Sequence, residues 1–334
     1  MAVRLIRRLL LCAVALLGSG VGAAGDVGSA DAGSVNAWLM RMHEASRQRA
    51  YTGTFVVSAG AQTASARIWH ICDGNQQMER VEPLSGAPRS TFRRNDQVIT
   101  FFPESRIAIA ENRDSLGLFP NLLKSSESNL GEFYQLKVLG SERVVGVEAD
   151  VVQLNPKDSA RYGYRIWSEK RTGLVVQLQT LDTAGQVIER AAFSELQLDA
   201  PVSMAKLSQM MGATEGYRVE SPNVQKTTPE AQGWSMRRQV AGFRSVGCYL
   251  RAVSAAGAGP ASQAMQWMFS DGLATVSLFV EPFDSRRHVR EGASDFGGAT
   301  RTLTRHLDGW WITAVGEVPA GTLNIFSQAL EHRK

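Results

Sequence analysis

A histidine, a cysteine and an aspartate lie close together in the stretch IWHICDG, from Ile68 to Gly74. If this stretch is a β-strand, His70 and Cys72 share one face, because alternate residues of a strand point the same way. Such a pair could bind a metal or act as a cysteine–histidine dyad. A zinc site needs three or four protein ligands, and beyond the N-terminal leader this half of the chain adds only His43. We therefore predict no metal, and a strand that ends in a turn at Asp73-Gly74.

No other motif for catalytic chemistry is complete. The run HEASR, from His43 to Arg47, begins like the zinc-protease motif His-Glu-x-x-His but has an arginine in place of the second ligand. The chain has no G-x-S-x-G elbow, P-loop, G-x-G-x-x-G or C-x-x-C motif. We expect the acidic pairs Glu79/Glu82 and Glu189/Glu195 on solvated strand edges. The sequence thus predicts a protein without catalytic residues or cofactor, and a hydrolase with an unrecognised site is the weakest alternative.

The N-terminus has the pattern of a secretory signal peptide. A segment with three arginines precedes the apolar run LLLCAVALL and the small-residue segment GSGVGAA. The apolar run is shorter than the roughly 20 residues that a membrane span needs, and Leu11 before Cys12 does not suit lipid attachment. We predict a signal peptide over 1–24, which is cleaved to leave a periplasmic protein.

Charge and cysteine content are best judged without this leader. Three of the 36 lysines and arginines belong to it, so 33 remain against 32 aspartates and glutamates. A nearly neutral chain does not predict nucleic-acid binding. Cys72 and Cys248 remain, 176 residues apart. The periplasm permits a disulfide, but one cysteine in each half of the chain favours two buried free thiols.

Hydrophobic periodicity predicts the elements that surround these residues. Apolar residues at helical spacing predict a helix over 34–49, and a period of two over 51–112 predicts a six-strand antiparallel meander. The leucine- and phenylalanine-rich segment 115–131 interrupts this pattern. Five further strands are expected over 134–198, followed by a short helix over 203–211.

A second, smaller domain follows. The polar stretch 213–232 has two prolines and few apolar residues, which predicts a linker on which two domains can reorient. Beyond it, hairpins about Asp271-Gly272 and Asp308-Gly309 and a helix from Pro319 to the end of the chain predict a small α+β domain over 233–334.

The first domain, expected over 34–212, is predicted to be one strongly bent antiparallel sheet with covering helices. A sheet that bends without closing must cover its concave face. Helices that cover this face loosely leave an apolar cavity able to hold acyl chains. With the small second domain, the fold class is α+β.

A basic cluster and two adjacent tryptophans stand out in the second domain. Arg286, Arg287 and Arg290 surround His288, and they could bind an acidic partner or a phosphorylated lipid head group, or form a solvated loop. In the pair Trp310-Trp311 one ring should be buried and the other exposed or at an interface, because neighbouring strand residues face opposite ways.

Five stretches of the chain resemble the periplasmic sigma-E regulatory proteins, the RseB/MucB family. In chain order they are AYTGTFV, ERVEPLSGAPR, RYGYRIWSEKRTGLVVQLQTLD, SDGLATVSLFVE and DGWWITAVGEVPAGTLNIFSQAL. Their order and spacing extend the resemblance from Ala37 to the C-terminus. Two features depart from the family pattern. Ala241-Gly242-Phe243 stands where relatives tend to have Pro-Gly-Phe, and Cys72 is not a position associated with the family.

The resemblance implies a large domain similar to the half-barrel of periplasmic lipoprotein carriers, with a separate small α+β module. It also implies binding to the periplasmic domain of a transmembrane anti-sigma factor, which is thereby protected from the first proteolytic cut. Lipid or lipopolysaccharide in the large domain is implied to release this grip. The protein could also form a homodimer. The alternative function is that of a periplasmic lipid or lipoprotein carrier.

The family has no short motif that names site residues, so we predict them from their positions. Apolar residues of the meander are the candidates to line the lipid cavity: Phe55, Val57, Ile68, Phe101, Ile107 and Ile109. The candidates for the partner surface are Arg286, Arg287 and Trp310.

Overall fold

The protein is described from a computed structural model. The structure describes residues 38–42, 49–74, 76–112, 130–253, 262–295 and 297–333. The predicted signal peptide and most of the segment 115–131 lie outside these residues. Of the helix predicted over 34–49, residues 38–42 are described, and they are helical. No helix in the described ranges is long and apolar enough to cross a membrane.

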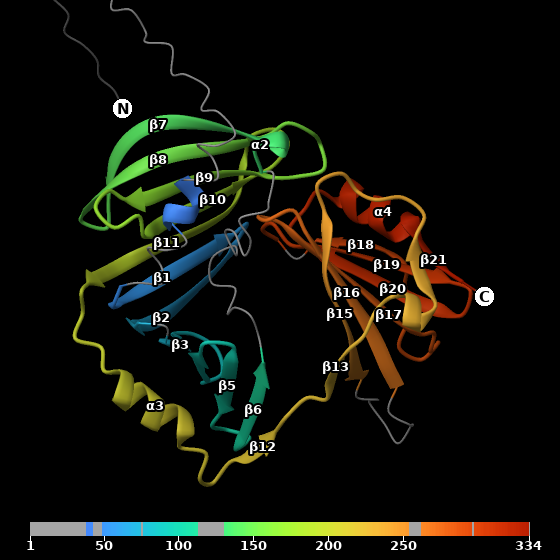
Figure 1. Ribbon diagram of the computed structural model, residues 1–334, viewed down its shortest axis with the longest axis horizontal. Coiled ribbons are helices and arrows are strands. Elements are labelled where there is room, and N and C mark those ends of the chain that lie inside the picture. The colour runs from blue at the N-terminus through green and yellow to red at the C-terminus, as the bar shows by residue number, and fades with distance from the viewer. Residues whose placement is uncertain are drawn as a thin grey trace, which may run out of the picture.

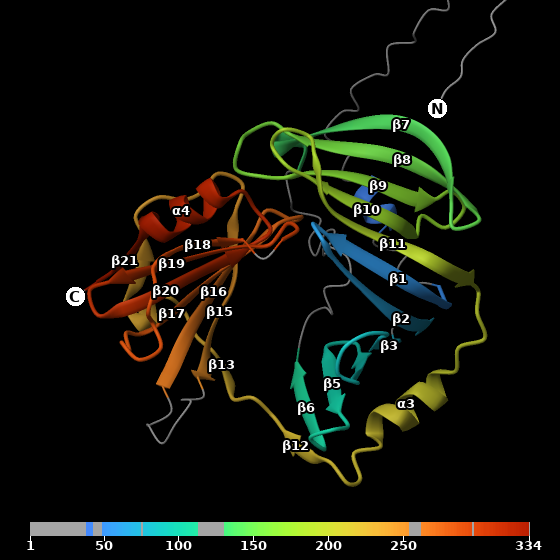
Figure 2. The same ribbon diagram turned by 180° about the vertical axis from the view of Figure 1, so that it is seen from behind.

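The N-terminal domain is built on one twelve-stranded sheet. Its strands are β1 (Tyr51–Ala59), β2 (Gln62–Asp73), β3 (Gln76–Pro83), β4 (Ser90–Arg94), β5 (Gln97–Phe102), β6 (Ile107–Asn112), β7 (Tyr134–Val144), β8 (Val147–Pro156), β9 (Gly163–Glu169), β10 (Val175–Leu181), β11 (Val187–Leu198) and β12 (Arg218–Glu220). Their spatial order is β12-β6-β5-β4-β3-β2-β1-β11-β10-β9-β8-β7. Figures 1 and 2 show this sheet curving strongly from β7 to β6.

Two antiparallel meanders make up this sheet. The predicted six-strand meander is confirmed, since β1 to β6 lie side by side in chain order. The five strands β7 to β11 form the second meander, and β11 joins the two by pairing with β1. The predicted turn after β2 is also confirmed, because Gly74 has a φ of 59°, which is the left-handed conformation that ends the strand.

Short helices cover both faces of the large sheet. The predicted helix over 203–211 appears as α3 (Met204–Gly212), and the Ser203 side chain caps it by accepting the Lys206 N–H. Leu207 and Met211 of α3 pack with Met78 and Phe92 on one face of the sheet. On the opposite face, Leu39 and Met42 pack with apolar residues of β7 to β10, next to α2 (Leu130–Phe133).

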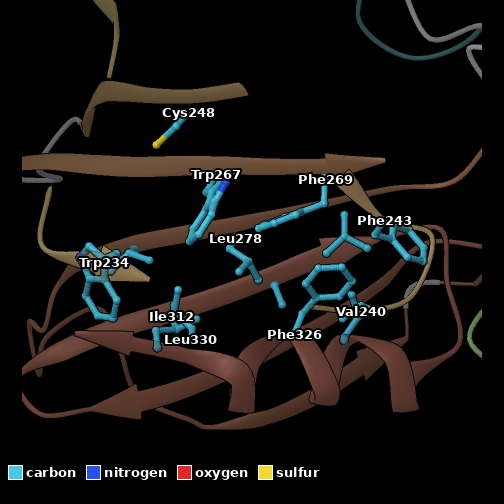
Figure 3. Close-up of a cluster of buried hydrophobic side chains, with 14 of the residues drawn as sticks. Trp234, Val240, Phe243, Cys248, Trp267, Phe269, Leu278, Ile312, Phe326 and Leu330 are labelled. Carbon is cyan, nitrogen blue, oxygen red and sulfur yellow. The ribbon is translucent and has the colours of Figure 1, made fainter. Parts of the chain in front are cut away.

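The C-terminal domain contains a seven-stranded antiparallel sheet and a helix. In spatial order its strands are β13 (Val224–Lys226), β15 (Arg244–Val253), β16 (Ser262–Ser270), β17 (Thr275–Pro282), β20 (Trp310–Gly316), β19 (Arg301–Leu307) and β18 (Gly292–Asp295). The helix α4 (Ala320–Ala329) packs Phe326 against Phe243 and Phe269, with ring centroids 5.4 and 5.0 Å away. Figure 3 shows these rings in the core between sheet and helix.

The predicted C-terminal helix is wrong in its length. Pro319 caps α4 at its start, but the helix ends at Ala329. Residues Leu330–His332 form β21, which pairs with β14 (Trp234–Met236) in a separate two-stranded sheet. The His332 ring packs on Trp234 with centroids 4.7 Å apart. Pairing with a distant strand therefore overrides the local helical pattern at this end.

The stretch predicted as a linker takes part in both sheets. Within 213–232 the structure forms β12, β13 and the short 3-10 helix η1 (Glu230–Gln232). β12 pairs in parallel with β6 of the large sheet, whereas β13 pairs with β15 of the small one.

Candidate functional site

Five of the six predicted cavity residues share one face of the large sheet. The pairing register places Phe55, Val57, Ile68, Ile107 and Ile109 on the same side across β1 to β6. Phe55 and Ile68 are buried, and the other three are half-buried. We call this side the first face of the sheet. Val57 packs against the buried cluster that contains Phe55 and Ile68, whereas Ile107 and Ile109 lie farther along the same face on β6. Half-buried aliphatic side chains of this kind suit contact with an apolar ligand.

Phe101 departs from this set because it lies on the opposite face of the sheet, which we call the second face. Its ring packs edge-on against Phe92 and Tyr217, with centroids 5.7 and 5.1 Å away, in the cluster that α3 covers. Strand β5 is apolar on both sides, with Phe101 and Phe102 adjacent. Because both sides of this strand are apolar, its sequence does not reveal which side α3 covers.

A buried polar group lies on the first face. His70 is 1% exposed, and its Nδ1 lies 3.0 Å from Oε1 of Glu79, whose Oε2 is 3.5 Å from Arg93 Nη1. Tyr51 stacks on the His70 ring at 4.9 Å. Burial acts to raise the pKa of the Glu79 carboxyl, but hydrogen bonds and charge from His70 and Arg93 outweigh it and hold this pKa below its usual value. Glu79 is thus an ionised group inside the sheet, and its predicted place on a solvated edge is wrong.

The opening histidine–cysteine pair does not build a reactive site in the described part of the chain. Cys72 lies on β2 as predicted and its Sγ donates to the Gly74 carbonyl at 3.4 Å, but it is half-buried rather than buried. Cys248 is buried, and both thiols are free. Burial, followed by the charge of Glu230, raises the pKa of Cys248 to about 11, so this thiol stays protonated. Across the described ranges no three histidine, cysteine or acidic side chains converge as metal ligands.

The basic cluster of the C-terminal domain is matched by its own acids. Arg286 lies 3.1 Å from Asp284, and Arg287 lies 2.9 Å from Glu281, which is also 3.3 Å from His288. Hydrogen bonds from Arg286 hold the pKa of Asp284 at about 2. Arg286 is highly exposed and Arg287 is mostly buried. Of the two predicted partner-binding arginines, Arg286 is therefore the more accessible to a partner.

The two adjacent tryptophans face opposite sides of the small sheet. Trp311 is buried and stacks on His288 with ring centroids 4.8 Å apart. Trp310 is half-buried and meets Trp234 edge-on at 5.6 Å. Trp310, predicted for the partner surface, therefore packs at the rim of the domain core.

One ionic contact that the sequence did not single out joins the two domains. Arg161 follows β8 in the N-terminal domain, and Asp271 lies in the turn between β16 and β17 of the C-terminal domain. Arg161 Nε donates to Asp271 Oδ2 at 2.7 Å, and both side chains are fully buried. Both residues lie in stretches that carry the family resemblance, and this is the only feature of the sequence that could have pointed to them. An Asp-Gly dipeptide, however, is typical of an ordinary hairpin turn.

Comparison with known proteins matches the whole of this architecture. The models for the MucB/RseB N-terminal domain and the MucB/RseB C-terminal domain match residues 34–211 and 228–331. The sigma factor AlgU regulatory protein MucB of Pseudomonas aeruginosa is 29% identical over 303 residues, which cover 89% of this chain and 90% of MucB. The sigma-E factor regulatory protein RseB of Haemophilus influenzae is 24% identical, with 92% and 94% of the two chains covered.

Solved structures give the same answer. MucB in complex with MucA(peri) matches with a TM-score of 0.68 and 25% identity, covering 91% of this chain and all of that one. A crystal structure of MucB matches with a TM-score of 0.64 and 23% identity, covering 90% of this chain and 98% of that one. The chain therefore belongs to the MucB/RseB family, a family of sigma factor regulatory proteins and not of enzymes.

Proposed function

We propose that this protein is a negative regulator of an envelope-stress sigma factor. It binds the periplasmic domain of the membrane-spanning anti-sigma factor and protects that domain from site-1 proteolysis. The observation that carries this proposal is the similarity, over 91% of the chain, to MucB solved in complex with MucA(peri). Masking a cleavage site needs a stable surface and no catalytic group. This agrees with the site described above, where Cys248 is buried in the core and Glu79 and Glu281 form ion pairs.

The second part of the proposal concerns a lipid signal. The large sheet acts as a half-barrel like that of lipoprotein carriers, and its first face takes up lipid or the acyl chains of lipopolysaccharide. Support comes from Val57, Ile107 and Ile109, which are half-buried on the same face of the sheet as the buried Phe55 and Ile68. Binding of lipid there weakens the grip on the anti-sigma factor.

The location of the protein follows from the same reasoning. The leader over 1–24 directs export, and the mature protein acts in the periplasm, where its partner domain lies. The functional units are the large domain over 34–212, the connection over 213–232 and the small domain over 233–334. A homodimer is compatible with this scheme. Arg286 is the exposed cation proposed for the partner surface, and Arg287 and Trp310 are the other two residues proposed for it.

The test is isothermal calorimetry of the mature protein with the periplasmic domain of the host's own anti-sigma factor, repeated with lipopolysaccharide fragments. We expect sub-micromolar binding that the fragments weaken. Arg286→Glu should weaken binding to the partner, while Arg143→Glu, on the exposed part of β7, serves as the matched control. Ile109→Glu should abolish the effect of the lipid, with Val187→Glu, at a strand position that is 50% exposed, as its control.

The alternative function is a periplasmic lipid or lipoprotein carrier that uses the same first face. A carrier moves lipid between two membranes, whereas a regulator does not need to. Transfer of a fluorescent lipid between donor and acceptor vesicles separates the two functions. Lipid transfer without binding to the anti-sigma factor would favour the carrier, and binding without transfer would favour the regulator.

A further inference from the structure

The connection between the two domains has very little free length. Residues 218–220 are held as β12 beside β6, and residues 224–226 are held as β13 beside β15. Residues 221–223 lie between these strands, are exposed and belong to neither sheet. Figures 1 and 2 show the chain crossing from one domain to the other at this point. Any change in the relative orientation of the domains is therefore concentrated in these three residues.

A second contact holds the domains together through buried charge. Asp271 receives hydrogen bonds at Oδ2 from Arg161 Nε at 2.7 Å and from the Tyr134 hydroxyl at 3.1 Å. Its Oδ1 accepts the backbone N–H groups of Leu273 and Ala274, at 2.9 and 2.8 Å, within its own turn. The carboxylate thus has partners in both domains, and neither it nor Arg161 has access to water.

Arg161 is held in place by groups on both sides of the interface. Its guanidinium lies 4.3 Å from the ring centroid of Phe133 in its own domain and 5.0 Å from that of Phe243 in the other. It also donates to the Ala241 carbonyl of the C-terminal domain and pairs with Asp158 of its own domain. A single side chain therefore bridges the end of the large sheet and the start of the small one.

The backbone opposite Arg161 has room for this contact because residue 242 is glycine. Gly242 has a φ of 80°, and a Cβ atom there would meet Arg161 Nη2 and the Phe133 ring, the latter at 2.8 Å. The neighbouring contacts follow the same line. Thr322 Oγ1 donates to the Ala160 carbonyl at 2.9 Å, and Leu273 packs in a buried cluster of the large domain.

The burial of both charges makes this contact all-or-none. If the domains slid by a few ångströms, a buried arginine or aspartate would lose its counter-charge while still shielded from water, which is the least favourable arrangement. If they separate fully, water solvates Asp271, and Arg161 keeps Asp158 as a partner. The docked and the fully separated arrangements are thus both favoured over anything between them.

We propose that the Arg161–Asp271 ion pair is a latch that holds the two domains in one arrangement, and that residues 221–223 are the hinge about which they swing apart when the latch breaks. The proposal concerns the domains themselves and does not depend on the function proposed above. It assigns a role to three residues of the interface, Arg161, Asp271 and Gly242.

The experiment uses the mature full-length protein and three variants, Asp271→Asn, Arg161→Met and Gly242→Ala. Small-angle scattering should show a larger maximum dimension in each variant, with the far-ultraviolet circular dichroism unchanged. Hydrogen exchange at the amides of Leu273 and Ala274 should speed up by about a hundredfold or more, because these amides lie beside the latch carboxylate. The matched controls are Arg286→Met, in an exposed ion pair, and Gly216→Ala, at a φ of 79° with open space around it.

Two results would overturn the latch. One is that all three variants are folded, scatter like the parent and exchange at the parental rate. The other is that all three lose the secondary structure of a whole domain, because a latch requires each domain to stay folded when the two separate. Gly242→Ala guards against a trivial loss of folding, since it removes no polar partner. Apart from the backbone strain that it shares with Gly216→Ala, it acts by blocking the approach of the other domain.

Discussion

Two arginine–aspartate pairs of this protein have similar geometry in opposite surroundings. Arg286 and Asp284 are two residues apart, 3.1 Å from each other and at the surface, whereas Arg161 and Asp271 are 2.7 Å apart, fully buried and on different domains. Water and salt screen the surface pair and can replace either partner. No water reaches the buried pair to replace a lost partner. The pair that is conspicuous in the sequence should therefore contribute least to the fold, and the inconspicuous one most.

The largest expected effect tests this contrast directly. Arg161→Met should lower the free energy of unfolding by about 3–5 kcal/mol, because docking would then bury Asp271 without its counter-charge, and separation of the domains gives up the docking free energy instead. Denaturant unfolding of the full chain, followed by tryptophan fluorescence, measures this change. Arg286→Met should leave the unfolding curve unmoved.

The double variant Arg161→Met/Asp271→Asn sharpens the same comparison. It should recover part of the lost stability, because neither buried charge remains. Equal and small effects of the two single arginine variants would contradict the contrast between the buried and the exposed pair.

The next effect separates steric fit from backbone strain. Gly242→Ala and Gly216→Ala both place a side chain at φ close to 80°, so both should lose roughly 1 kcal/mol of stability from strain. Gly242→Ala should lose a further ~1–3 kcal/mol because its new methyl group meets Arg161 and Phe133. Thermal unfolding of the two variants side by side gives this difference. If the two variants melt at the same temperature, Arg161 and Phe133 can move to accept the new methyl group, and the close packing at Gly242 contributes no stability.

Features of the fold that depend only on residues close together in the chain were predicted correctly from the sequence. Period-two alternation predicted the six strands over 51–112, and the Asp73-Gly74 dipeptide predicted the turn after β2, because both features are encoded within a few residues. Phe101 was grouped with five residues that lie on the other face of the sheet, since strand β5 is apolar on both faces. The local sequence pattern identifies a strand more readily than it identifies which helix packs over each face of that strand.

Features that depend on distant partners could not be predicted in the same way. Leu330–His332 follow a helical pattern but pair with β14, nearly a hundred residues earlier, as the end of the chain meets Trp234. Asp271 looks like the first residue of an exposed turn, and Glu79 like a solvated edge residue. Asp271 is buried and Glu79 is largely withdrawn from water only because another domain or another strand supplies a hydrogen-bond partner. Such pairing is a property of the fold rather than of the local sequence.

A buried charge within one domain provides a smaller contrast to the latch. Glu79→Gln should cost about 1 kcal/mol at neutral pH, the difference between a charged and a neutral hydrogen bond to His70. The pKa of Glu79 is lowered in the folded protein, so its contribution is present above the ordinary carboxyl value of about 4.3 and is lost as the pH falls. Unfolding free energies of parent and variant should therefore converge in acid. Glu104→Gln, at an exposed turn, is the control and should show no such convergence.

The smallest effect comes from a carboxylate that opposes domain docking. Burial, and then the charge of Glu189 on the large domain, raises the pKa of Glu317 on the small one. The folded protein thus favours the protonated form, and stability is lost as the pH rises from the ordinary carboxyl range through the raised value. Parent and Glu317→Gln should melt together near pH 4, and the variant should be more stable at pH 7 by less than about 1 kcal/mol. Glu189→Gln should reduce this pH dependence, because Glu189, which accepts the Ala299 N–H across the interface, is the second cause. A parent–variant difference that stays constant from pH 4 to pH 7 would mean that Glu317 ionises freely in the docked protein and does not work against the latch.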